Sequence, residues 1–102
     1  VFGVAGGMAH SALGMCLMKD LIPGDATWSV CGVGPNQVPA AMQSAIMGGH
    51  IRVGLEDNTR VPGGELAKGN WEQVEVAVKI AKLAEREVAT PDEAREMLHL
   101  KK

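Results

Sequence analysis

The sequence has little cysteine and no cluster of basic residues. Its two cysteines, Cys16 and Cys31, lack the spacing of a metal or redox motif, so we expect two buried free thiols in a reducing compartment, the cytoplasm. The formal net charge of −2 gives no reason to expect nucleic acid or a membrane surface as a partner. With 102 residues, the chain amounts to one domain at most.

Charged residues are absent from a long central segment, residues 26–51. A run of this length raises the question of a membrane span, but it contains Asn36, Gln37 and Gln43 as well as prolines and glycines, which argue against one. The first five residues carry no basic leader, so we expect no signal peptide.

Arg52 ends the uncharged run and needs a partner, a ligand or solvent. Apolar and other residues alternate from residue 51 to residue 56, which predicts a short strand with Arg52 and Glu56 on the same side. Glu56 or Asp57 could pair with Arg52. An Asp-Asn pair after a strand is also an ordinary opening of a turn, so Asp57 and Asn58 alone do not establish a site.

Strand-like and helix-like segments alternate three times, and a last helix follows. The expected strands cover residues 1–5, 27–33 and 50–56, and the expected helices cover residues 8–19, 36–48, 70–86 and 90–98. Residues 59–69, with Pro62-Gly63-Gly64 at their centre, are expected to form a long loop at the same rim as Glu56 and Asp57.

Several expected helix ends carry local signals. The pair Gly48-Gly49 is typical of a C-cap. Asn70 and Gln73 have the spacing of a capping box, and Thr90 and Glu93 repeat it with a proline between them.

Alternation of strands and helices predicts parallel pairing through right-handed crossovers. Three parallel strands leave two open edges and an uncovered face, whereas parallel sheets are nearly always buried on both faces. Because the chain begins with a strand and has no initiator methionine, we expect it to be the last part of a larger barrel or doubly wound sheet.

Residues 48–58, together with Trp28-Ser29-Val30, Leu66-Ala67-Lys68 and residues 87–96, resemble the C-terminal part of the β-keto acid cleavage enzymes, the 3-keto-5-aminohexanoate cleavage family. The resemblance implies an α/β fold, with the last three βα units and the terminal helix of a (β/α)8 TIM barrel. Residues 1–102 would then be the C-terminal segment of a single TIM-barrel domain whose N-terminal part is absent.

The resemblance also implies an activity. The family uses zinc, or another divalent metal, to cleave a β-keto acid with acetyl-CoA, which gives acetoacetate and a new CoA ester. By resemblance, Glu56 is a metal ligand, Asp57 is the base, and Arg52 is the cation that positions the base. Adjacent side chains on a strand point oppositely, so Asp57 must lie where the strand bends into the loop. A cytoplasmic homo-oligomer active in lysine degradation is implied as well.

The family's remaining zinc ligands are two histidines one residue apart, and this sequence has no His-x-His. We expect structural or solvated roles for His10, His50 and His99. The segment alone is therefore expected to bind zinc weakly and to catalyse nothing.

Two other functions stay open. A nucleotide-binding α/β domain would use Gly32-Val33-Gly34 before a helix, although Gln37 stands where the third glycine of a dinucleotide fingerprint belongs. A noncatalytic packing module would keep Arg52 and Asp57 as a structural ion pair. The identity of the β-keto acid and the oligomeric state are not encoded in recognisable residues.

Overall fold

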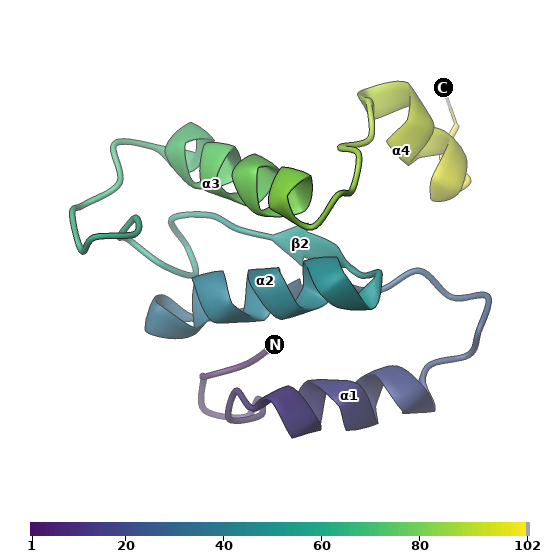
Figure 1. The fold of residues 1–102 in the computed structure, drawn as a ribbon, viewed down its shortest axis with the longest axis horizontal. Helices are drawn as coiled ribbons and strands as arrows, with labels where there is room; N and C mark the ends of the chain where they lie inside the picture. Colours follow the sequence, from purple (N-terminus) through teal and green to yellow (C-terminus); the bar gives the residue numbers. More distant parts are fainter. Residues whose placement is uncertain (102) are drawn as a thin grey trace.

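The computed structural model describes residues 1–101 and has the expected α/β character. Its elements are α1 (Ala12–Leu21), β1 (Ser29–Cys31), η1 (Gly34–Asn36), α2 (Gln37–Met47), β2 (His50–Arg52), α3 (Asn70–Leu83) and α4 (Pro91–Met97). Figure 1 shows α2 in the middle of the molecule, with α1 and α3 on either side of it and α4 set apart at the C-terminal end.

The sheet is parallel and follows the order of the chain. β1 pairs with β2, and Cys31 lies opposite Arg52. On the other side of β1, the Phe2 amide donates to the Cys31 carbonyl at 2.8 Å, and the Phe2 carbonyl accepts from the Val33 amide at 2.9 Å. Each segment therefore neighbours the one that precedes it in sequence.

The strands are shorter than the sequence predicts. A strand over residues 1–5 is wrong, because only Phe2 pairs with β1 before the chain turns at Gly3, where φ is +86°. The strands expected over residues 27–33 and 50–56 are each reduced to three residues. Beyond Arg52 the chain enters a turn, so the expected alternation up to Glu56 does not occur on a strand.

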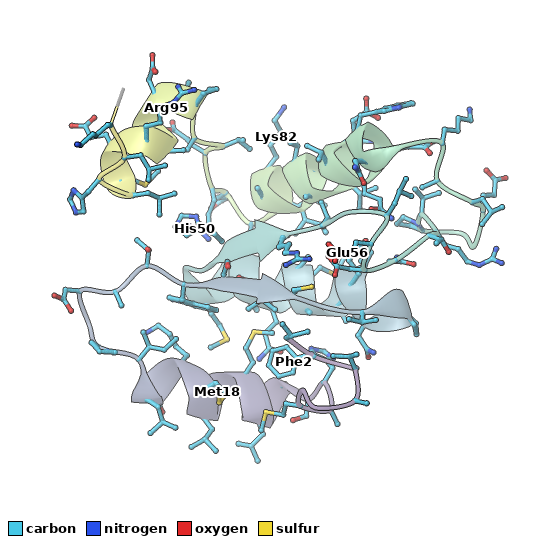
Figure 2. The ribbon with its side chains drawn as sticks, turned by 180° about the vertical axis from the view of Figure 1, so that it is seen from behind. Phe2, Met18, His50, Glu56, Lys82 and Arg95 are labelled. Carbon is cyan, nitrogen blue, oxygen red and sulfur yellow. The ribbon has the colours of Figure 1, made fainter. Side chains whose placement is uncertain are left out.

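One face of the sheet is covered by α2, and Figure 2, seen from behind, shows no helix of the described chain crossing the opposite face. Two apolar clusters hold these layers together. The first joins α1, β1 and α2 through Phe2, Met15, Val30 and Ala40. The second joins α2 and α3 through Ala41, Ala45 and Ile80, with Ile51 of β2 packed against it.

Some local helix signals are confirmed. Gly48 is the C-cap of α2 in the left-handed region with φ of 88°, and Thr90 and Glu93 form a complete capping box at the start of α4. α1 begins at Ala12, later than predicted, because Ser11 is the N-cap and its hydroxyl accepts from the Gly14 amide at 2.9 Å.

The capping box predicted for Asn70 and Gln73 is wrong. The N-cap of α3 is Gly69, and neither predicted side chain caps the helix. The Asn70 side chain accepts a hydrogen bond from the Leu55 amide at 2.8 Å, and Gln73 is 1% exposed. Both side chains therefore make tertiary hydrogen bonds and do not cap the helix.

The cysteines differ from each other. Cys31 is buried as predicted, whereas the prediction of burial is wrong for Cys16, which is exposed on α1. Both are free thiols. None of the helices within residues 1–101 has the length and apolar character that a membrane crossing requires.

Candidate active site

Arg52 is the last residue of β2 and places its guanidinium at the end of the sheet. Its side chain is 53% exposed, so it reaches away from the core. The charge of Asp57 is the main cause that raises the pKa of Arg52 above its ordinary value, followed by Cys31 and Glu56. The guanidinium therefore stays positively charged.

The two predicted carboxylates lie on a turn directly after this strand. The Gly54 carbonyl accepts hydrogen bonds from the Asp57 and Asn58 amides, both at 3.1 Å. The Asp57 carbonyl accepts from the Gly34 amide at 2.8 Å, which ties the turn to the segment that follows β1. The requirement that Asp57 lies where the strand bends is confirmed.

Arg52 contacts both carboxylates. Its Nε and Nη2 atoms donate to the two oxygens of Asp57 at 3.1 and 3.3 Å, and Nη2 also donates to Glu56 Oε2 at 2.9 Å. The prediction that Arg52 finds its partner in Glu56 or Asp57 is thus confirmed for both. Asp57 is only 10% exposed in this arrangement, whereas Glu56 is 84% exposed.

One arginine against two carboxylates leaves an excess of one negative charge at this end of the sheet. Asp57 is held at both oxygens by a planar fork, which fixes its orientation. Glu56 uses one oxygen and leaves the other open to solvent. The pair therefore combines a restrained carboxylate with one that is free to meet a ligand.

Cys31 is a neighbour of this cluster that the sequence did not point to. It is 6% exposed and faces Arg52 across the sheet register. Burial raises the pKa of the Cys31 thiol, and a hydrogen bond with Asp57 and the charge of Asp57 raise it further. The thiol therefore stays protonated and adds a weak donor beside the base candidate.

A group of buried amides supports the turn from below. Gln73 of α3 donates from Nε2 to the Asn58 carbonyl, and the Asn58 side chain donates to Gln37 Oε1 at 3.3 Å. Gln37 and Gln73 are 3% and 1% exposed. The residue after Asp57 is thereby anchored to α2 and α3. Only the fold brings these amides together, so no sequence pattern predicted their role.

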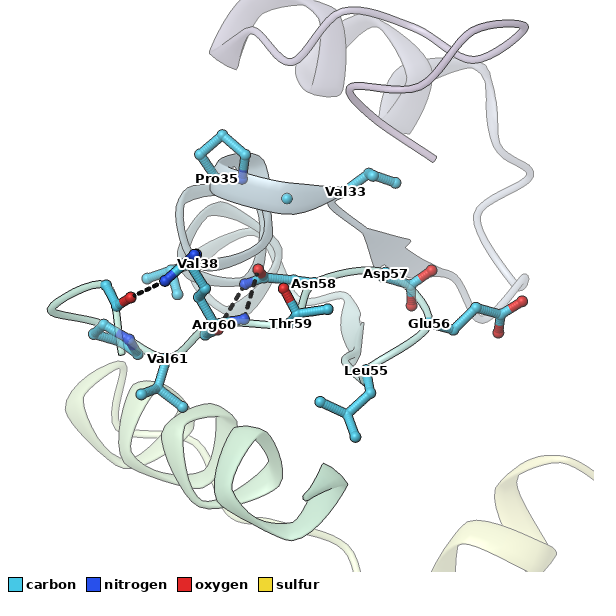
Figure 3. Close-up of a pocket in the computed structure, with 13 residues that line it drawn as sticks. Val33, Pro35, Val38, Leu55, Glu56, Asp57, Asn58, Thr59, Arg60 and Val61 are labelled. Carbon is cyan, nitrogen blue, oxygen red and sulfur yellow. Dashed lines mark hydrogen bonds between the residues drawn. The ribbon is translucent and has the colours of Figure 1, made fainter. Parts of the chain in front are cut away.

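A cavity of about 630 Å³ opens beside the carboxylates. It lies between the end of β1, the turn and the loop after the turn, and Figure 3 shows Glu56 and Asp57 at one end of its lining residues. Its size is typical of sites for small ligands. The loop predicted for residues 59–69 indeed lies at the same rim as Glu56 and Asp57.

Residues 1–101 contain no group of three or more His, Cys, Asp or Glu side chains that could hold a metal ion. His10 packs edge-on against Phe2 with ring centroids 5.5 Å apart, as a structural role requires. His50 is exposed on β2, and His99 is exposed after α4. Glu56 is the one predicted metal ligand, and a single carboxylate does not complete a zinc site.

The glycine turn after β1 serves the same site rather than a phosphate. The Gly34 amide is used by the Asp57 carbonyl at 2.8 Å. A Cβ at Gly32 would lie 2.3 Å from the Asn36 carbonyl oxygen, so glycine is needed for close backbone packing. Both features explain Gly32-Val33-Gly34 without a nucleotide.

Comparison with known proteins shows to which family the chain belongs. A family model described as beta-keto acid cleavage enzyme matches residues 1–100. The chain belongs to the beta-keto acid cleavage enzyme family. It is 50% identical over 95 residues to a 3-keto-5-aminohexanoate cleavage enzyme of Fusobacterium nucleatum, which covers 93% of this chain and 35% of that protein.

Two further relatives of this beta-keto acid cleavage enzyme chain differ in the substrate they are named for. A 3-keto-5-aminohexanoate cleavage enzyme of Acetoanaerobium sticklandii is 43% identical, with 100% of this chain and 37% of that protein covered. A 3-oxoadipate:acetyl-CoA acetyltransferase of Cupriavidus necator is 41% identical over 81% of this chain and 29% of that protein. The chain thus spans between 29% and 37% of the length of these three relatives.

Proposed function

We propose that residues 1–102 form part of an acetyl-CoA-dependent β-keto acid cleavage enzyme, to which they contribute the base Asp57 and the metal-binding carboxylate Glu56. The proposal is carried by one observation: Arg52 holds both oxygens of Asp57 and one oxygen of Glu56 beside a ligand-sized cavity. The names of the relatives support the reaction class. In this reaction a β-keto acid and acetyl-CoA give acetoacetate and a new CoA ester.

Asp57 is suited to the role of base because its position is held. Arg52 donates to both of its oxygens, which fixes the orientation of the carboxylate. The low exposure of Asp57 limits competition from water. A proton removed from the keto acid would be accepted at a carboxylate oxygen, and Arg52 would keep that oxygen oriented toward the cavity.

Glu56 is suited to the role of a metal ligand because one of its oxygens makes no hydrogen bond within residues 1–101 and its side chain is solvent-exposed. We propose zinc, or another divalent metal, with its remaining ligands outside the described residues. When bound, such a metal supplies a Lewis acid for the keto oxygen. The chain alone does not complete that site, so we expect residues 1–102 by themselves to be inactive.

We also propose that the complete protein is a (β/α)8 barrel and that the described elements are its last three βα units and terminal helix. The support is topological. Phe2, β1 and β2 lie side by side in chain order, and one sheet face is free of helices. Singly wound barrels have this arrangement, whereas doubly wound sheets carry helices on both faces. The two free thiols agree with a cytoplasmic location, and a homo-oligomer remains our expectation.

The test is Asp57→Asn in the complete protein. Loss of a general base is expected to lower the rate of acetoacetate formation by about 100- to 10,000-fold, with the fold retained. Suitable substrates are 3-keto-5-aminohexanoate and 3-oxoadipate, for which two relatives are named. The matched control is Asp92→Asn, which also removes a carboxylate paired with an arginine, at 3.0 Å from Arg95 on α4.

Other outcomes would favour the competing functions. A variant that unfolds, with no specific loss of turnover in the folded fraction, supports a packing module. Saturable nucleotide binding that is equal in both variants, with no acetoacetate formed by the unmodified protein, supports a nucleotide-binding domain.

A further inference from the structure

A second charged group faces the cavity beside the carboxylates. Arg60 lines the same cavity as Glu56 and Asp57, and Figure 3 shows it toward the other end of the lining residues. Most of the remaining lining is apolar, with side chains of Val33, Pro35, Val38, Leu55, Val61 and Pro62. An apolar cavity with a few convergent polar groups is typical of a site that orients a small ligand.

The backbone around Arg60 is held rigidly. Its amide donates to Asn58 Oδ1 at 3.0 Å, and its carbonyl accepts from Asn58 Nδ2 at 2.9 Å. Arg60 and Leu66 form an antiparallel bridge, and the Val61 amide donates to the Glu65 carbonyl at 3.0 Å. These bonds fold the rim loop into a small hairpin, so Arg60 is fixed relative to the turn that carries Asp57.

The guanidinium of Arg60 has little of its charge compensated. It donates from Nη1 to the Gly64 carbonyl at 2.6 Å, which is a neutral acceptor. No ion pair to Arg60 occurs among residues 1–101, unlike Arg52 and Arg95, which each meet a carboxylate. A guanidinium has five N–H donors, so most of them remain for an anionic ligand.

We propose that Arg60 forms an anion-binding subsite of this cavity, which takes a carboxylate or phosphate group at the far end of a ligand whose other end lies at Glu56 and Asp57. A carboxylate or a phosphate accepts two parallel hydrogen bonds from an arginine fork, which gives both affinity and orientation. The anionic group can come from two ligands, and their choice rests on the proposed function. It is either the second carboxylate of a β-keto acid or a phosphate of the CoA ester.

The two sources are separated by binding measurements on the complete protein. Isothermal titration with adipate, a dicarboxylate that does not react, probes the carboxylate source, and titration with coenzyme A probes the phosphate source. In Arg60→Gln, the Kd of the probe that occupies the subsite is expected to rise about tenfold, as loss of one charge-assisted interaction predicts. Because the glutamine side chain ends two bonds short of the arginine Nη1 that donates to the Gly64 carbonyl, the charged and uncharged probes on the unmodified protein separate anion binding from a purely structural role of Arg60.

Two variants serve as controls. Arg60→Lys retains the positive charge but not the planar fork, so the Kd of the bound probe is expected to rise, by less than in Arg60→Gln. Arg95→Gln removes an exposed arginine on α4, far from the lining of the cavity, and is expected to change neither Kd.

A comparison of charged with uncharged probes on the unmodified protein does not depend on whether a variant folds. On the unmodified protein, uncharged adipamide should bind at least about tenfold more weakly than adipate if the carboxylate occupies the subsite. Pantetheine should show the same loss relative to coenzyme A if the phosphates do. Equal affinities within both pairs, no binding of either charged probe, or unchanged Kd values in Arg60→Gln would overturn the subsite.

Failure of the subsite is distinguishable from failure of the proposed function. If the unmodified protein forms acetoacetate and probe binding is unchanged in Arg60→Gln, the proposed subsite is refuted and the proposed activity is supported. If probe binding depends on Arg60 but no β-keto acid tested yields acetoacetate, the proposed subsite is supported and the proposed activity is refuted.

Discussion

Truncation of Gln73 tests whether the amides beneath the site hold the catalytic turn. Gln73 is 1% exposed in α3, and its Nε2 donates to the carbonyl of Asn58, the residue that follows Asp57. Its Oε1 atom is buried and finds no partner among residues 1–101. The side chain therefore contributes packing and one hydrogen bond to stability, whereas burial of Oε1 without a hydrogen bond lowers the free energy of unfolding.

Two substitutions separate these contributions. Gln73→Ala removes a buried side chain close in size to methionine, for which truncation costs about 2–5 kcal/mol. It also leaves the Asn58 carbonyl without its donor, at about 1–3 kcal/mol, but removes the unpartnered Oε1, which offsets a similar amount. A net loss of about 2–5 kcal/mol follows. Gln73→Met keeps the volume, so its free energy of unfolding is expected to lie within about 1 kcal/mol of the unmodified protein.

The assay is urea-induced unfolding of the complete protein, with acetoacetate formation measured on the same samples. Both variants are expected to lose turnover, because neither holds the Asn58 carbonyl beside Asp57. Equal destabilisation by alanine and methionine would refute the division between packing and hydrogen bonding. Full activity in Gln73→Met would refute the claim that this bond positions the turn.

Three further predictions concern single positions. Gly32→Ala is expected to destabilise the protein by about 2 kcal/mol or more, because its Cβ would lie 2.3 Å from a backbone carbonyl oxygen, whereas Gly24→Ala meets nothing within 4 Å and serves as the control in thermal melts. Alkylation near neutral pH should modify exposed Cys16 quickly and Cys31 slowly, since burial raises the pKa of Cys31; equal rates would contradict this. Hydrogen bonds from its N-cap lower the pKa of Glu93, so its stabilisation of α4 is complete above pH 4.5 and is lost as pH falls through the folded-state pKa, which amide exchange in α4 should detect.

The sequence predicted those parts of the site that depend on neighbours in the chain. The sequence indicated that Arg52 needs a partner, a ligand or solvent and offered Glu56 or Asp57 as the partner, and both carboxylates, four and five residues later, contact it. The bend at Asp57 followed from the rule that adjacent strand side chains point oppositely. Cys31 and Gln73 were missed because their roles depend on strand register and helix docking, which local spacing does not specify.

By itself the sequence determined the left-handed end of α2 at Gly48 and the capping box of Thr90 and Glu93, because a few consecutive residues supply all the hydrogen bonds involved. Only the tertiary structure decided where pairing stops and which side chains are buried. β2 ends at Arg52 because the chain turns there to meet Gly34, and Gln73 is buried rather than capping because α3 docks over the turn. Those outcomes depend on surfaces that come together only when distant segments pack.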